Sequence, residues 1–234
     1  MLAYAVGDIH GRADLLLRMI DMLRDDALQA EDVQGRPVLI FLGDYIDRGF
    51  QSKAVIDTLN GPAVSDFDTR FLRGNHEAAF LHFLSDSEFG PKWATYGGIE
   101  TLVSYSVRPP SIRTDEAEWE RVRDDLSKAL PQGHLAFLQS LENQITLGDY
   151  EFVHAGVAPN VALDQQVEDD LLWIRDEFLL NKKRLERVIV HGHTPEAAPY
   201  RDNRRIGLDT GAYMSGRLTA ARFQGNNVRF LSTT

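Results

Sequence analysis

The first third of the chain alternates three times between a short apolar segment, a polar loop that contains glycine, and a stretch with helical spacing of apolar side chains. The apolar segments are residues 2–6, 38–42 and 70–72, and the helical patterns follow at about 15–23, 53–59 and up to about residue 84. Parallel strands need a crossover between them, and a helix commonly provides it. The pattern therefore predicts an α/β fold with a largely parallel sheet covered by helices.

The remainder of the chain has a different pattern. Residues 85–131 contain two glycines in succession, two prolines in succession and an acidic helical stretch, and we interpret them as a helical insertion that borders the functional site. Short strands are predicted at 144–147, 151–154, 188–190, 205–208, 218–223 and 228–231. Because 234 residues suit one α/β domain, we expect a single domain over residues 1–234, with no secretory leader before the first strand.

Composition limits the chemistry of this chain. It has no cysteine, which excludes a thiol nucleophile, thiolate metal ligands and disulfides. Its formal net charge is −10, and an acidic chain is a poor general binder of nucleic acid, whose phosphates require Lys and Arg. We therefore expect no nucleic-acid partner, although bound cations would offset part of this charge. No run of about 18 apolar residues is present, so we predict no membrane span and a cytoplasmic location. The oligomeric state is left open.

Polar side chains follow the predicted strands at the point where each strand ends. In open α/β sheets, ligands bind in the crevice outside these carboxyl ends. Imidazole and carboxylate together suit divalent transition ions, and a shared carboxylate can bridge two ions about 3.5–4 Å apart. The sequence thus predicts a site for two metal ions at one edge, built from Asp8 and His10, Asp44 and Asp47, Asn75 and His76, His154, and His191 or His193.

Five motifs at these positions resemble the calcineurin-like metallophosphoesterase superfamily. Within it, the chain is similar to the phosphoprotein phosphatases, especially the bacterial and phage lambda-type serine/threonine enzymes. The resemblance implies a β-sandwich of mixed sheets flanked by helices, in four αββα layers. The motifs are Gly7-Asp8-Ile9-His10-Gly11, Gly43-Asp44-Tyr45-Ile46-Asp47-Arg48-Gly49, Gly74-Asn75-His76-Glu77, His154-Ala155-Gly156 and Gly192-His193-Thr194-Pro195, and Asp209-Thr210-Gly211-Ala212 also fits.

The resemblance also implies a role for each site residue. Asp8 and His10 would bind the first metal, Asp44 would bridge both, and the second would be held by Asn75, His154 and His193. Two divalent ions are expected, and the resemblance favours Mn²⁺. Fe and Zn are alternatives, because the types of ligand do not distinguish among these metals. The expected reaction is hydrolysis of phosphate from phosphoproteins, on Ser or Thr and as an alternative Tyr, by a hydroxide that the two metals hold.

Proton transfer and phosphate binding are assigned in the same way. His76 would protonate the leaving oxygen, and Asp47 would orient His76, since a carboxylate beside an imidazole favours the imidazolium. Arg48 and Arg73 would hold phosphate oxygens with planar guanidinium groups. Arg175 fits a third phosphate-binding arginine of the family.

Several residues allow a structural interpretation instead. His82 and His134 lie on predicted helices outside the motifs, and we interpret them as structural. His191 alternates with His193 along a predicted strand, so it should point away from the site. Asp209 is either a partner of a metal-binding histidine or a turn residue, and we leave it out of the site. Tyr45 either packs beneath the site or lines it.

The main rival function is hydrolysis of diadenosine tetraphosphate. Relatives with that activity typically have a small residue where this chain has Asp47, so Asp47 favours a protein phosphatase. A nuclease is disfavoured by the acidic charge, and a non-catalytic scaffold by the presence of every ligand position and of His76. The chain departs from the family at Phe50, where many members have proline, and we expect Phe50 to line the entrance and favour aromatic substrates such as phosphotyrosine.

Overall fold

A computed structural model describes residues 1–31, 35–112 and 114–233, and its first sheet has the strand order β10-β9-β1-β2-β3. Parallel pairing joins β1, β2 and β3, which confirms the prediction for the first third of the chain. The sheet as a whole is mixed, because β9 and β10 add an antiparallel hairpin beside β1. Its strands are β1 (Leu2–Val6), β2 (Val38–Phe41), β3 (Asp68–Phe71), β9 (Thr219–Gln224) and β10 (Asn227–Ser232).

The second sheet has the order β4-β5-β6-β8-β7 and repeats this design. Its central strands β5, β6 and β8 are parallel, while β4 and β7 pair antiparallel at the two edges. Both sheets therefore present the carboxyl ends of three parallel strands. The strands are β4 (Gln144–Leu147), β5 (Tyr150–Val153), β6 (Val188–His191), β7 (Tyr200–Arg201) and β8 (Arg205–Gly207).

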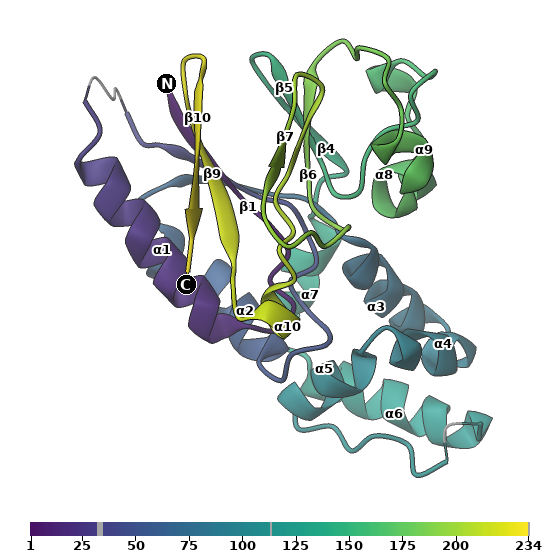
Figure 1. Ribbon diagram of the computed structural model, residues 1–234. Helices are drawn as coiled ribbons and strands as arrows, with labels where there is room; N and C mark the ends of the chain where they lie inside the picture. The colour runs from purple at the N-terminus through teal and green to yellow at the C-terminus, as the bar shows by residue number, and fades with distance from the viewer. Residues whose placement is uncertain (32–34, 113, 234) are drawn as a thin grey trace.

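Side chains of β1 alternate between two apolar cores, as the two-residue period of a strand requires. Tyr4 and Val6 are buried beneath the helices, whereas Ala3 and Ala5 face a core that also contains Phe152 and other residues of the second sheet. The two sheets consequently pack face to face. Together with the helices on both outer faces, they form the expected four-layer αββα sandwich (Figure 1).

The outer face of the first sheet is covered by α1, α2, α3, α6 and α7, and that of the second sheet by the short helices α8 and α9. On α1, Leu16, Met19, Ile20 and Leu23 are fully buried at helical spacing, so one stripe of the helix faces the core. The helices are α1 (Ala13–Leu28), α2 (Ser52–Leu59), α3 (Asn75–Ser85), α4 (Gly90–Thr95), α5 (Gly98–Ser104), α6 (Glu116–Ala129), α7 (Gln132–Gln139), α8 (Glu168–Trp173), α9 (Asp176–Leu179) and α10 (Ala212–Ser215), with 3-10 turns at Pro62–Val64, Ser87–Phe89 and Leu163–Gln165.

The segment 85–131, in which residue 113 lies outside the described residues, contains α4, α5 and α6, whereas residues 105–112 between α5 and α6 form no helix. Helices α4 and α6 pack beside α3 through buried aromatic rings: Trp93 stacks on Phe83 with ring centroids 4.8 Å apart, and Trp119 meets Phe83 edge-on at 5.7 Å. Helix α5 packs against α2 and α4. The hydroxyl oxygens of Thr101 on α5 and Ser52 on α2 are 3.0 Å apart and share a hydrogen bond. In the part of the chain that the structure describes, no helix is long and apolar enough to span a membrane.

Candidate metal centre

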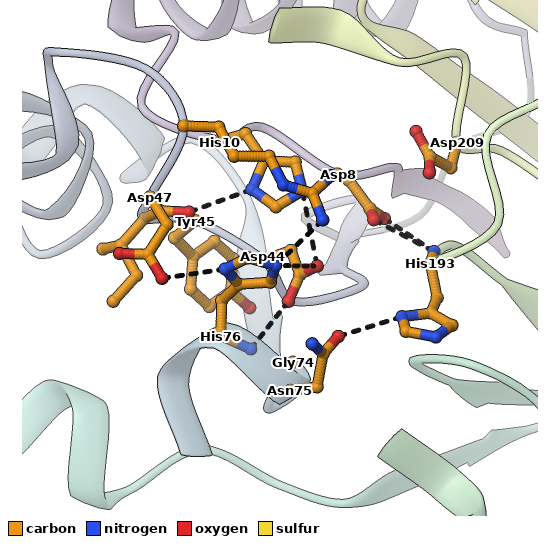
Figure 2. A network of polar contacts seen from close by, with 12 residues as sticks. Asp8, His10, Asp44, Tyr45, Asp47, Gly74, Asn75, His76, His193 and Asp209 are labelled. Carbon is orange, nitrogen blue, oxygen red and sulfur yellow. Dashed lines mark hydrogen bonds and ion pairs between the residues drawn. The ribbon is translucent and has the colours of Figure 1, made fainter. Parts of the chain in front are cut away.

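The polar residues predicted at strand ends lie at the carboxyl ends of five of the six parallel strands, and Asp209 follows the sixth. Asp8 and His10 follow β1, Asp44 and Asp47 follow β2, and Asn75 and His76 come just after β3. From the second sheet, His154 follows β5 and His193 follows β6, while Asp209 follows β8. Figure 2 shows side chains from both sheets pointing toward one centre.

The first cluster of donor atoms comprises His10, Asp44 and His76, whose donor atoms lie within 4.8 Å of one another. His10 Nδ1 lies 3.0 Å from the carbonyl oxygen of Ile46, so Nδ1 carries the hydrogen and Nε2 has a free lone pair. Burial lowers the pKa of His10 to about 3, and its Nε2 has no hydrogen-bond partner. This atom points at Asp44 Oδ2 from 3.4 Å, as a metal ligand would.

The second cluster comprises Asp44, His154 and His193, with Asn75 among them. His154 Nδ1 lies 2.8 Å from the carbonyl oxygen of Leu42 and is its donor, which leaves a lone pair on Nε2. That lone pair faces Asn75 Oδ1 at 2.9 Å and His193 Nδ1 at 3.2 Å, and the latter two atoms are 2.9 Å apart. Burial lowers the pKa of His154 and of His193. His154 Nε2 and Asn75 Oδ1 are both acceptors, and two acceptors that face each other without a proton between them fit a cation.

Asp44 belongs to both clusters. Its Oδ2 lies 3.4 Å from His10 Nε2, and its Oδ1 lies 3.4 Å from His154 Nε2. Burial alone would raise the pKa of Asp44, but His154 and the other surrounding histidines lower it well below its ordinary value. A carboxylate that stays ionised and directs one oxygen toward each cluster has the placement of a bridging ligand.

Asp8 lies between His10 and His193 (Figure 2), and its two oxygens accept the backbone N–H of His193 at 3.1 and 3.0 Å. Burial raises the pKa of Asp8 well above its usual value, and the nearby charges of Asp209 and Asp44 raise it further. Three buried carboxylates therefore repel one another unless a cation lies near them. A Cβ at Gly192 would collide with Asp8, which explains glycine at that position.

The loops that carry these residues are strained. Among the described residues other than glycine, positive φ angles occur at six positions, and five of these are site residues. Such conformations cost free energy and persist where surrounding contacts enforce them, which is common at functional sites. The five are His10, Asp44, Asp47, Arg48 and His193.

His76 and Asp47 form the pair that the sequence predicts: His76 Nδ1 lies 2.8 Å from Asp47 Oδ2. Burial would lower the pKa of His76, but the charges of Asp44 and Asp47 outweigh it and raise the pKa. Asp47 is itself held by residues of the 85–131 segment. Trp93 Nε1 donates to its Oδ2 at 3.0 Å, and Thr101 Oγ1 donates to its Oδ1 at 2.6 Å. The sequence does not predict these two contacts, because no motif links positions so far apart.

The three predicted phosphate-binding arginines lie in different surroundings. Arg48 Nη2 is 3.2 Å from His76 Nε2, and its guanidinium lies over the Tyr213 ring at 4.9 Å. Arg175 Nη1 is 3.3 Å from Thr194 Oγ1, next to His193 in the chain. Arg73 instead pairs with Glu168 on α8 at 2.9 Å.

The residues whose role the sequence leaves open have definite places. Tyr45 packs beneath the site, fully buried, and its hydroxyl donates to the carbonyl oxygen of Leu72 at 2.7 Å. His191 Nε2 lies 3.0 Å from Arg205 Nη1, away from both clusters. Asp209 accepts the N–H of Gly211 at 2.8 Å and also lies near Asp8 (Figure 2). His134 bonds Asp57 and Tyr105, while His82 is exposed and stacks on Phe89.

A four-layer αββα sandwich with clustered imidazoles and carboxylates at the ends of its parallel strands defines a metal-dependent phosphoesterase. The family model described as calcineurin-like phosphoesterase matches residues 1–230, so the chain belongs to that family and is a hydrolase of the metallophosphoesterase class. This confirms the superfamily that the motifs resemble.

Similar proteins carry two kinds of name. The bis(5'-nucleosyl)-tetraphosphatase PrpE [asymmetrical] of Bacillus subtilis is 27% identical over 236 residues, covering 93% of this chain and 89% of the relative. The protein of that name from Halalkalibacterium halodurans is 27% identical, and the match covers 93% of this chain and 88% of the relative. Among solved structures, a candidate diadenosine tetraphosphatase superposes with a TM-score of 0.63 at 21% identity, covering 100% of this chain and 94% of the other. The cold-active protein-tyrosine phosphatase of a psychrophilic Shewanella species superposes with a TM-score of 0.62 at 16% identity, covering 100% and 80%.

Proposed function

We propose that this protein hydrolyses dinucleoside tetraphosphates asymmetrically. The observation that carries the proposal is the match, over nearly the full length of both chains, to relatives named as asymmetrical bis(5'-nucleosyl)-tetraphosphatases. The protein phosphatases are similar in fold at lower identity. The preference for phosphoproteins, which Asp47 suggests from sequence, therefore becomes the second candidate.

The donor atoms of the centre would hold two divalent ions. Asp8, His10 and Asp44 would bind the first, and Asp44 with Asn75, His154 and His193 the second. The fit is supported by the unpartnered Nε2 of His10, the facing lone pairs of the second cluster and the buried carboxylates. When bound, such a pair of ions lowers the pKa of water and neutralises charge on a phosphate. We propose Mn²⁺, with Fe and Zn as alternatives that metal analysis of the purified protein distinguishes.

The reaction consumes one water molecule and breaks one phosphoanhydride bond. Cleavage between the first and second phosphates yields a nucleoside triphosphate and a nucleoside monophosphate, and it releases a proton at neutral pH. Arg48 and Arg175 border the clusters and would hold phosphate oxygens with their guanidinium groups. Arg73 would do the same after exchanging its partner Glu168 for the substrate.

His76 would donate a proton to the leaving oxygen from Nε2, since its Nδ1 is occupied by Asp47. Nε2 now faces Arg48 at 3.2 Å, so the arginine would turn toward the substrate phosphate before His76 acts. Asp47 would keep the ring oriented, because Trp93 and Thr101 fix both of its oxygens.

Two classes of substrate, tested on the same preparation, decide the proposal. The purified protein with Mn²⁺ would be assayed with diadenosine tetraphosphate and with phosphoserine and phosphotyrosine peptides, and the nucleotide products would be separated by chromatography. We expect the higher kcat/KM with the dinucleotide, and ATP plus AMP as products. A higher kcat/KM for either peptide, or ADP as the only nucleotide product, would refute it.

Hydrolysis of phosphoprotein monoesters is the second candidate, and the His76–Asp47 pair favours it. An alkoxide or phenolate leaving group gains more from general acid catalysis than a polyphosphate does, because it is the stronger base. Phe50, two residues after Arg48 in the chain, is 67% exposed and would contact an aromatic substrate such as phosphotyrosine. An unchanged ratio of phosphotyrosine to phosphoserine turnover in Phe50→Ala would contradict that contact.

A further inference from the structure

A pocket of about 420 Å³ lies between α3, α4 and α8. Two of its lining residues also contact the metal centre. The Tyr96 ring lies 6.0 Å from the ring of His76, and the Trp173 ring lies 6.2 Å from the ring of His193. The floor of the pocket includes Ala78, two residues beyond His76 on α3. The pocket is thus a continuation of the catalytic site.

Aromatic rings form the wall next to the centre. Tyr96 and Trp173 approach each other with ring centroids 5.7 Å apart, and Phe89 lines the pocket farther along. Trp173 is 37% exposed, whereas the other two tryptophans, Trp93 and Trp119, are buried at 0% and 1%. An indole that the fold leaves open to solvent, beside a phosphate-binding centre, offers a flat apolar surface on which a ring can stack.

Polar side chains form much of the remaining lining, and one of them is a cation. Lys92 lies over the Phe89 ring, with its Nζ 5.5 Å from the centroid, and among the described residues no carboxylate forms an ion pair with it. His82 stacks on the same ring of Phe89, with the two ring centroids 4.1 Å apart. Asp169 of α8 also lines the pocket. Flat rings with a few polar groups at the rim suit a heteroaromatic base, which has an apolar face and polar edges.

We propose that this pocket binds the base of the nucleoside attached to the cleaved phosphate, with Tyr96 and Trp173 as the stacking residues. The inference rests on the proposed function. In asymmetrical cleavage, one nucleoside is separated from the broken bond by a single phosphate and the other by three. Tyr96 and Trp173 contact His76 and His193 themselves, so the pocket is placed for the nearer nucleoside. It follows that AMP, which carries this nucleoside, binds as a product.

Binding of AMP compared with ribose 5-phosphate tests the base directly, since the two ligands share the phosphate and the ribose. Because Trp93 and Trp119 are buried, quenching of tryptophan fluorescence reports mainly on Trp173. With Mn²⁺ present, we expect saturable quenching by AMP and an affinity about tenfold higher than that of ribose 5-phosphate, in line with stacking of one base on an aromatic side chain. Equal affinities for the two ligands would overturn the proposal.

Variants locate the interaction. Trp173→Ala, measured by calorimetry, should reduce the affinity for AMP to that for ribose 5-phosphate, and Trp173→Phe should retain part of the difference. Tyr96→Ala should weaken the quenching by AMP several-fold. Leu180→Ala is the control, because Leu180 is 68% exposed after α9 and does not line the pocket. If Trp173→Ala kept the full preference for AMP, the base would bind elsewhere and the proposal would be wrong.

The same measurements separate this proposal from the proposed function. If the protein prefers AMP through Trp173 but does not cleave diadenosine tetraphosphate, the pocket assignment is supported and the proposed reaction is wrong. If it cleaves the dinucleotide with equal KM in Trp173→Ala and in wild type, the reaction stands and the pocket assignment is wrong. Quenching by O-phosphotyrosine without quenching by AMP would overturn the proposal in favour of a phosphorylated aromatic side chain.

Discussion

The carboxylate of Glu77 accepts the backbone N–H of Asp44 at 2.9 Å. The same oxygen, Oε2, accepts the N–H of Gly74 at 2.9 Å, and Oε1 accepts that of Tyr45 at 2.8 Å. Glu77 therefore ties the loop after β2 to the loop after β3. Both loops carry proposed metal ligands, and the loop with Asp44 has the positive φ angle that needs such support.

Replacing Glu77 with Gln should loosen this connection. A glutamine presents one acceptor oxygen and one amide donor, so part of the N–H groups would face another donor. At about 1–3 kcal/mol for each unsatisfied buried group, we expect a loss of about 3 kcal/mol of unfolding free energy. That corresponds to a fall in Tm of about 6–12 °C in a chain of this size.

Calorimetric unfolding of Glu77→Gln would measure this loss, with Glu88→Gln as an exposed control that keeps the wild-type Tm. Affinity for Mn²⁺ should also fall by about 10–100-fold, the usual effect of removing a group that positions metal ligands. If the Tm of Glu77→Gln stayed within a degree of wild type, Glu77 would not connect the loops as described.

Much of the fold could be predicted because it is encoded locally. The strands of the first third and the helices after them follow from apolar periodicity. Their observed ends lie within about two residues of the predicted ones, as at β3, where 70–72 is predicted and Asp68–Phe71 is found, except that α1 continues to Leu28, beyond the apolar spacing at 15–23. The antiparallel hairpin of β9 and β10 beside β1 is a long-range pairing that no local pattern specifies. The contacts of Trp93 and Thr101 with Asp47 also join residues far apart in the sequence, so no local pattern predicts them.

The convergence of the site residues could also be predicted, because polar residues follow the ends of the predicted strands in loops that contain glycine. Glu77 lies inside one of these motifs, but its role depends on the N–H groups of another loop, which only the folded chain brings near it. Substrate preference is harder to predict from the sequence. It rested on the single residue Asp47, whereas the relatives that match nearly the whole chain carry the name of a dinucleotide hydrolase.

The effect of replacing His76 should depend on the leaving group. For diadenosine tetraphosphate, the leaving oxygen belongs to a phosphate and needs little help from an acid, so we expect His76→Asn to reduce kcat by about tenfold or less. For a phosphoserine peptide, the reduction should reach about 10²–10⁴-fold, the usual contribution of general acid catalysis. Steady-state kinetics on both substrates would measure this, and Asp21→Asn serves as a control because Asp21 is exposed on α1 and outside the clusters. Equal reductions on the two substrates would contradict the role of His76 as an acid.

Asp44→Asn should remove both metal ions together, because Asp44 directs one oxygen toward each cluster. An amide has one weak oxygen ligand and no charge, so neither cluster keeps a charged bridging ligand. Elemental analysis after gel filtration should give less than one ion per chain, with kcat below detection. Asp21→Asn, at an exposed position on α1, should keep the wild-type metal content. If Asp44→Asn retained both ions, the bridging assignment would be wrong.

Removing the metal should destabilise the protein. Without cations, Asp8, Asp44 and Asp209 are buried close together, and this raises the pKa of Asp8 after the larger effect of burial. A ligand at about 100 times its Kd stabilises the folded state by about 2.7 kcal/mol, which corresponds to about 5–10 °C in Tm for a chain of this size. We therefore expect EDTA to lower Tm by at least about 5 °C and Mn²⁺ to restore it. A Tm that does not respond to either would count against the metal centre.

His134 should make stability depend on pH. Burial lowers the pKa of His134 in the folded state, against the opposing charge of Asp57, so the unfolded chain binds the proton more readily. The contribution of the neutral His134 ring to the free energy of unfolding is therefore fully present above the unfolded pKa of about 6.5. It is lost as the pH falls through and below that value. Between pH 7 and pH 5.5, protonation of this group can lower the free energy of unfolding by at most about 1 kcal/mol.

Urea unfolding at the two pH values should show a smaller loss of unfolding free energy in His134→Gln than in wild type. His82→Gln, at an exposed position, should behave as wild type does. An equal loss in His134→Gln and wild type would show that other groups determine the acid sensitivity.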